Sequence, residues 1–94
     1  MKVVYNYYTD PGHGWLAVPL AELEGFVPSE YSYLDDTFAY LEEDCDLGDW
    51  MDHVGIEKGE FGRGYFWDSS IEDVHTDDES FIRGLDRFPV RVTA

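Results

Sequence analysis

The sequence predicts an α+β fold in a single domain, residues 1–94, with a small antiparallel sheet of about four to five strands and two or three short helices. Short β-branched and aromatic runs are separated by turn residues, which is typical of hairpin strands. Between them, apolar residues recur every three or four positions, which favours amphipathic helices. Because 44% of the residues are hydrophobic and 17% aromatic, we expect the chain to bury a core.

The first 25 residues predict a hairpin and a short helix. Residues 2–9, KVVYNYYT, read as a strand, and residues 15–18 as its return strand. The turn at residues 10–14 contains a proline that fixes one dihedral angle and two glycines that permit positive φ. Pro19 suits the first position of a helix over residues 20–25, which a glycine ends.

A second hairpin is predicted from residues 31–34 and 37–41, which flank the polar turn residues Asp35 and Asp36. Side chains alternate between the two faces of a strand, so alternate residues of each strand share one face. The aromatic residues placed in this way are the expected core of the sheet: Tyr31, Tyr33, Phe38 and Tyr40.

Residues 40–54, YLEEDCDLGDWMDHV, predict a strand that runs into an acidic amphipathic helix. Asp44 or Asp46 is expected to cap the helix, because a carboxylate there accepts from unpaired backbone N–H groups and suits the positive helix terminus. Gly55 is expected to end it. The apolar positions follow the i, i+3, i+4, i+7 pattern: Leu47, Trp50, Met51 and Val54.

The remainder gives weaker patterns. Residues 56–64 are glycine-rich and predict a loop or irregular strands, residues 65–67 are a strand candidate, and residues 71–75 extend it or pair with it. Residues 80–88 predict a final amphipathic turn, and residues 90–94 a short edge strand. The side chains of that turn expected to pack inward are Phe81, Ile82, Leu85 and Phe88.

The charge balance is strongly acidic. The chain has 21 Asp and Glu against 6 Lys and Arg, a formal net charge of −15. Solubility of a small domain normally needs a net charge of only about 2 to 8 in magnitude. Seventeen of the carboxylates lie in residues 30–79, and the sign reverses in the last fifteen residues. Direct binding to nucleic acid or to an anionic membrane is therefore disfavoured, and a basic partner is favoured.

The sequence also predicts a soluble protein of the cytoplasm. A single cysteine, Cys45, excludes an intramolecular disulfide framework and fits a reducing compartment. The N-terminus has no basic flank followed by an apolar segment, and no run approaches the roughly 18 apolar residues of a membrane span. Aromatic side chains at the surface are compatible with a dimer as well as with a monomer.

The spacing of possible metal ligands argues against a metal site. A calcium-binding EF-hand loop needs glycine at its sixth place, whereas in a loop counted from Asp44 the fifth place is Gly48 and the sixth is Asp49. Zinc needs about four nitrogen or sulfur ligands, and Cys45 and the three histidines are scattered. We expect no metal and no cofactor.

Catalytic motifs are equally weak, so the protein is not expected to be an enzyme. The thiolate of Cys45 is disfavoured by its acidic neighbours Glu43, Asp44 and Asp46, and the chain has no phosphate-binding glycine loop or nucleophile elbow. His13 lies between two glycines on a turn. A turn residue is the favoured interpretation, and a functional exposed imidazole is the alternative.

The acidic residues themselves have two interpretations. One is a solvated face that keeps an aromatic-rich protein soluble. The other is mimicry of nucleic acid, because carboxylates on successive helical turns lie about 5–6 Å apart and a basic groove built for phosphates accepts them. The candidate partner-binding residues are Asp35, Asp36, Glu42, Glu43, Asp46, Asp49, Asp52, Asp68, Glu72, Asp73, Asp77 and Asp78.

Three runs, TDPGHGWLAVPLAELEGF, YSYLDDTFAYLEEDCD and DESFIRGLDRF, resemble small acidic proteins carried by phages and plasmids. The resemblance covers about two thirds of the chain. A small, strongly acidic protein of this kind looks like the anti-CRISPR or anti-restriction proteins that mimic DNA. It implies a cytoplasmic inhibitor that occupies the DNA-binding groove of a CRISPR surveillance complex. The alternatives are an acidic regulatory or antitoxin-like partner of a basic protein and, less favoured, a small metal-dependent enzyme.

Overall fold

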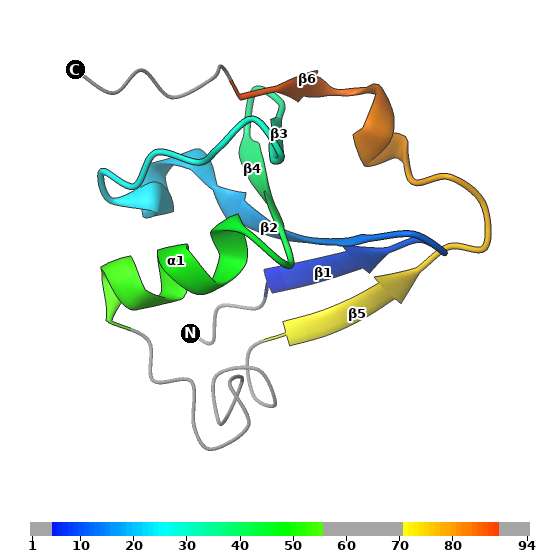
Figure 1. The fold of residues 1–94 in the computed structure, drawn as a ribbon, viewed down its shortest axis with the longest axis horizontal. Coiled ribbons are helices and arrows are strands. Elements are labelled where there is room, and N and C mark those ends of the chain that lie inside the picture. The colour runs from blue at the N-terminus through cyan, green and yellow to red at the C-terminus, as the bar shows by residue number, and fades with distance from the viewer. Residues whose placement is uncertain (1–4, 56–70, 89–94) are drawn as a thin grey trace.

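The computed structural model describes residues 5–55 and 71–88, which form a sheet of six strands, one α-helix and two 3-10 turns (Figure 1). The order of strands across the sheet is β5-β1-β2-β4-β3-β6. The strands are β1 Tyr5–Thr9, β2 Gly14–Pro19, β3 Tyr33–Leu34, β4 Phe38–Glu42, β5 Ile71–His75 and β6 Asp86–Arg87; the helix is α1 Asp46–Val54, and the turns are η1 Leu20–Leu23 and η2 Phe81–Gly84.

Both predicted hairpins are confirmed. Strand β1 pairs antiparallel with β2, with Tyr7 opposite Leu16, and β3 pairs antiparallel with β4, with Tyr33 opposite Tyr40. The hairpins join through β2 and β4, where Leu16 lies opposite Leu41. Strand β2 is buried from Gly14 to its fifth residue, because side chains pack on both faces of the sheet.

The antiparallel sheet of four to five strands is corrected to a mixed sheet of six. Strand β5 lies parallel to β1, with Tyr5 beside Ile71 and Thr9 beside His75. Parallel neighbours require a long crossover connection, so this pairing brings residues more than 60 positions apart to the same edge (Figure 1). The expected partner of β5, residues 65–67, lies outside the described residues.

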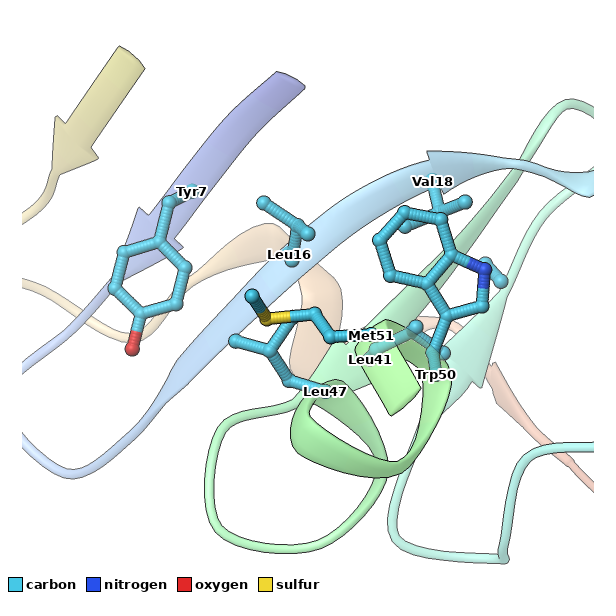
Figure 2. Close-up of a cluster of buried hydrophobic side chains, with 8 residues drawn as sticks. Tyr7, Leu16, Val18, Leu41, Leu47, Trp50 and Met51 are labelled. Carbon is cyan, nitrogen blue, oxygen red and sulfur yellow. The ribbon is translucent and has the colours of Figure 1, made fainter. Parts of the chain in front are cut away.

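One face of the sheet is covered by α1, as the apolar period predicts. Leu47, Trp50 and Met51 of the helix are buried against side chains of β1, β2 and β4 (Figure 2). Full burial of a side chain of this size contributes about 1.5–3 kcal/mol, so this contact fixes the helix on the sheet. The strand side of the cluster consists of Tyr7, Leu16, Val18, Ala39 and Leu41.

The predicted aspartate cap of α1 is wrong. The N-cap is Cys45 without a side-chain hydrogen bond, and the side chain of Asp46 is turned inward, with 1% of the residue exposed. The Asp46 carboxylate accepts from the Ser29 N–H at 3.0 Å, from the Ser29 hydroxyl at 2.8 Å and from the Ser32 hydroxyl. It therefore ties the helix start to the segment at residues 29–32, which precedes β3. Gly55 ends the helix at φ +80°, as predicted.

The opposite face carries a second, aromatic cluster under η2. The prediction that Tyr33 and Tyr40 are core residues is confirmed, and Phe38 packs beside them half-buried. Tyr31 is 56% exposed and Phe81 is 55% exposed, so these two were wrongly placed inside. The buried members of the cluster are Trp15, Ala17, Tyr33, Tyr40 and Ile82.

The predicted helix after β2 is shorter than expected. Pro19 ends β2, and the 3-10 turn η1 ends at Leu23 because Glu24 and Gly25 both adopt positive φ. Residues 2–4 of the first predicted strand, the loop 56–64 and the strand candidate 90–94 lie outside the described residues. Within residues 5–55 and 71–88, no helix is long and apolar enough to cross a membrane.

Candidate functional site

The acidic charge dominates the described surface. Residues 5–55 and 71–88 contain 18 of the 21 Asp and Glu and only two of the 6 Lys and Arg, Arg83 and Arg87. Asp68 lies outside these ranges. Of the other eleven predicted partner-binding residues, seven are exposed: Asp36, Asp49, Asp52, Glu72, Asp73, Asp77 and Asp78.

Two of the predicted surface carboxylates are interior groups. Asp46 is buried as described above, and Glu42 is 7% exposed at the end of β4. One oxygen of Glu42 accepts from the Asp44 N–H at 2.8 Å. Both were predicted to bind a partner at the surface, and the structure instead buries them.

Asp35 and Glu43 are half-buried and accept hydrogen bonds from tyrosines of the sheet. Asp35 accepts from the Tyr40 hydroxyl at 2.7 Å and from two backbone N–H groups of its turn. These bonds, that of Tyr40 foremost, hold the pKa of Asp35 below its usual range. Glu43 accepts from the Tyr7 hydroxyl at 2.6 Å. Both carboxylates are therefore already committed to hydrogen bonds within the fold.

The exposed acids are distributed over both faces of the sheet. The register of β5 places Asp73 beside Tyr7, on the α1 face, and Glu72 beside Asn6, on the opposite face. Asp49 and Asp52 lie on α1, whereas Asp77 and Asp78 are exposed in the connection from β5 to η2. We call Asp49 and Asp52 the helix acids, and Asp77 and Asp78 the connection acids.

The structure has a cleft on the face opposite α1 that the sequence did not predict. It has a volume of about 270 Å³. Trp15 and Tyr33 are packed edge to face beneath it, with ring centroids 6.2 Å apart, and Tyr31 contributes a wall. These aromatic rings come from β2, from β3 and from the segment before β3.

Both arginines of the described residues line this cleft. The Arg83 guanidinium lies 5.3 Å from the centre of the Trp15 ring and donates to both oxygens of Asp10, at 2.6 Å and 3.0 Å. Arg83 first, and then backbone N–H groups, hold the pKa of buried Asp10 far below its usual range. Arg87 lies 5.1 Å from the centre of the Tyr33 ring.

Glu42, His13 and Cys45 line the same cleft. A Glu42 oxygen lies 3.6 Å from Nδ1 of His13, close enough for an ion pair when the imidazole is protonated. Loss of hydration, followed by the charge of Glu42, raises the pKa of the Cys45 thiol. This shift disfavours the thiolate form of the cysteine; the expected lack of catalytic activity stays a prediction.

One group of side chains can hold a cation at the rim of the cleft. Ligand atoms of His13, Glu42 and Glu43 lie within 4.8 Å of one another. Gly14 makes this approach possible, because a Cβ there would lie 2.3 Å from the Tyr7 hydroxyl oxygen and 3.1 Å from a Glu43 oxygen. An imidazole and two carboxylates suit several divalent metals. The expected lack of a metal stays a prediction.

Comparisons with protein-family models, with curated proteins and with solved structures each find no match. The functional argument therefore depends on the charges and geometry of this chain.

Proposed function

We propose that the protein is an acidic inhibitor that occupies the basic, DNA-binding groove of a partner, in its most specific form that of a CRISPR surveillance complex. One observation carries the proposal. Eighteen carboxylate residues stand against two arginines in residues 5–55 and 71–88, and Arg83 is already paired with Asp10. Such an excess goes beyond what solubility needs and favours association with a basic surface.

The helix acids support mimicry because they are held on a fixed element. Asp49 and Asp52 are three residues apart on α1, so their side chains are neighbours on the helix surface, about 5–6 Å apart at Cβ. Trp50 and Met51, which lie between them in sequence, are buried against the sheet. A carboxylate pair on a packed helix loses little conformational entropy when it meets a row of lysines or arginines.

A CRISPR target is tested by competition. Labelled target DNA is bound to the purified surveillance complex, and the protein is titrated in. We expect the DNA to be displaced, and a lack of displacement contradicts mimicry at this target. The same titration at increasing salt is expected to show a falling affinity, since salt screens exposed charges.

A matched pair of variants separates a specific surface from total charge. The first variant neutralises the helix acids and the connection acids: Asp49→Asn, Asp52→Asn, Asp77→Asn and Asp78→Asn. The control removes four other carboxylates: Glu24→Gln, Glu30→Gln, Asp44→Asn and Asp86→Asn. The first is expected to weaken inhibition on the order of tenfold more than the control. Equal losses favour a purely non-specific charge effect and contradict a defined docking surface.

A further inference from the structure

The cleft opposite α1 is lined by the positively charged side chains of the described residues. Its lining includes both arginines of the described ranges, although 18 carboxylate residues lie in the same ranges. The two guanidinium groups differ in availability. Arg83 is bound to both oxygens of buried Asp10, which neutralises its charge. Arg87 has no carboxylate partner among residues 5–55 and 71–88 and contacts the Tyr33 ring.

The same lining also offers a negative group. Glu42 is buried at the end of β4, and one of its oxygens is engaged by the Asp44 N–H. The other lies 3.6 Å from Nδ1 of His13, which is longer than a hydrogen bond. A buried carboxylate with acceptor capacity to spare favours a cationic donor over a neutral one. The lining thus places the carboxylates of Glu42 and Asp44 in the same cleft as the guanidinium group of Arg87.

The body of the cleft is aromatic and small. Its volume of about 270 Å³ lies just below the roughly 300–1,000 Å³ of typical ligand pockets, which suits a small ligand of amino-acid size. Trp15 is 2% exposed, and its indole N–H has no hydrogen-bond partner. Aromatic walls favour a ligand with an apolar or planar body between its polar ends.

We propose that this cleft binds a small aromatic zwitterion, with the ligand carboxylate on Arg87, its ammonium on Glu42 and its ring against Trp15 and Tyr33. The binding is reversible and involves no covalent step. The proposal does not depend on the acidic surface binding a partner, so either can fail without the other.

Two probe zwitterions test the proposal on the full chain. L-Phenylalanine carries both charged groups on its α-carbon, and 4-(aminomethyl)benzoate carries them at opposite ends of a ring. Each is compared with the amine that lacks its carboxylate, phenethylamine or benzylamine, and with the acid that lacks its ammonium, 3-phenylpropionate or 4-methylbenzoate. The indole N–H resonance of Trp15 reports binding. That of Trp50, which donates to the Glu22 carbonyl at 3.1 Å, is the internal reference.

We expect at least one zwitterion to shift the Trp15 resonance saturably. We also expect it to bind on the order of tenfold or more tightly than both of its singly charged analogues, because each analogue lacks one charge-assisted hydrogen bond, and such bonds are stronger than neutral ones. If neither zwitterion saturates, if an analogue binds equally well, or if Trp50 shifts as much as Trp15, the proposal is overturned.

Arg87→Gln tests the carboxylate position, since Arg87 is exposed and its replacement leaves the core intact. The variant is expected to bind the zwitterion no more tightly than the matching amine, and its affinity for that amine is expected to be unchanged. Asp86→Asn, a neighbouring exposed charge outside the cleft, is the control and is expected to change neither. The assignment is contradicted if Arg87→Gln binds the zwitterion as tightly as the wild type does, or if its affinities for the amine and for the zwitterion fall equally.

Discussion

At the scale of single residues, the acidic side chains divide by their surroundings rather than by their position in the sequence. Asp46 and Asp49 lie three residues apart on α1, yet the first accepts hydrogen bonds from the loop at residues 29–32 and the second is exposed. Asp10 is similarly enclosed by Arg83, Ser80 and its own turn. Buried carboxylates hold segments together, whereas the exposed ones face solvent.

Asp46→Ala is expected to destabilise the protein by at least about 2 kcal/mol, because the donors at Ser29 and Ser32 lose a buried acceptor. The free energy of unfolding is measured by urea denaturation. Asp49→Ala, on the same helix but exposed, is the control and should change it by about 0.5 kcal/mol or less. Similar losses in the two variants would show that Asp46 does not tie the helix to the loop.

Asp10 and Arg83 give the fold a predicted acid sensitivity. The pKa of Asp10 is lowered in the folded state, mainly by Arg83, so the stability it contributes is present above its unfolded pKa of about 3.9 and is lost as the pH falls below that value. Asp10→Asn should therefore have lower stability at pH 7 and a shallower decline below about pH 5 than the wild type. If the free energy of unfolding fell in parallel for the wild type and for Asp10→Asn as the pH is lowered, this assignment would be contradicted.

At the scale of elements, the sequence predicts what is set by neighbouring residues. Both hairpins and α1 follow from alternation, turn chemistry and an apolar period, which are local signals. The parallel pairing of β5 with β1 had no such signal, because the two strands are joined across more than 60 residues. The inward turn of Asp46 was missed for the same reason, since its partners Ser29 and Ser32 belong to a distant loop.

The cleft had a partial sequence signal. The change of charge sign in the last fifteen residues points to Arg83 and Arg87, but nothing in the sequence links these arginines to Trp15 and Tyr33. That link arises only when β6 pairs with β3 and η2 covers the second face of the sheet.

The end of α1 gives a test at this scale. Gly55 lies at φ +80°, and a Cβ there would meet nothing within 4 Å, so Gly55→Ala is strained by its backbone alone. We expect a loss of about 1 kcal/mol, measured by thermal or urea unfolding. Gly84→Ala is the matched control, because that site is equally open and lacks a positive φ. A loss at Gly84 as large as that at Gly55 would contradict the left-handed helix end.

At the scale of the whole molecule, the net charge of −15 opposes the compact state and at the same time attracts a basic partner. The hydrophobic clusters on both faces of the sheet offset this repulsion. Added salt is therefore expected to stabilise the protein alone and to weaken its complex with a basic groove.

The stabilising effect is checked by thermal unfolding of the isolated protein at low and at near-molar sodium chloride. A higher Tm at high salt is expected because the Debye length falls to about 3 Å at 1 M salt, which screens the exposed carboxylates from one another. An unchanged Tm would show that the acidic groups do not repel one another appreciably in the folded state.

The proposal that exposed carboxylates occupy a groove built for DNA can be tested by the salt dependence of the affinity for a surveillance complex. We expect the affinity to fall steeply as salt rises, because salt screens exposed charges. The variant with Asp49, Asp52, Asp77 and Asp78 neutralised should show a shallower fall than the wild type. An affinity that does not change with salt, or the same slope in that variant, would contradict the claim.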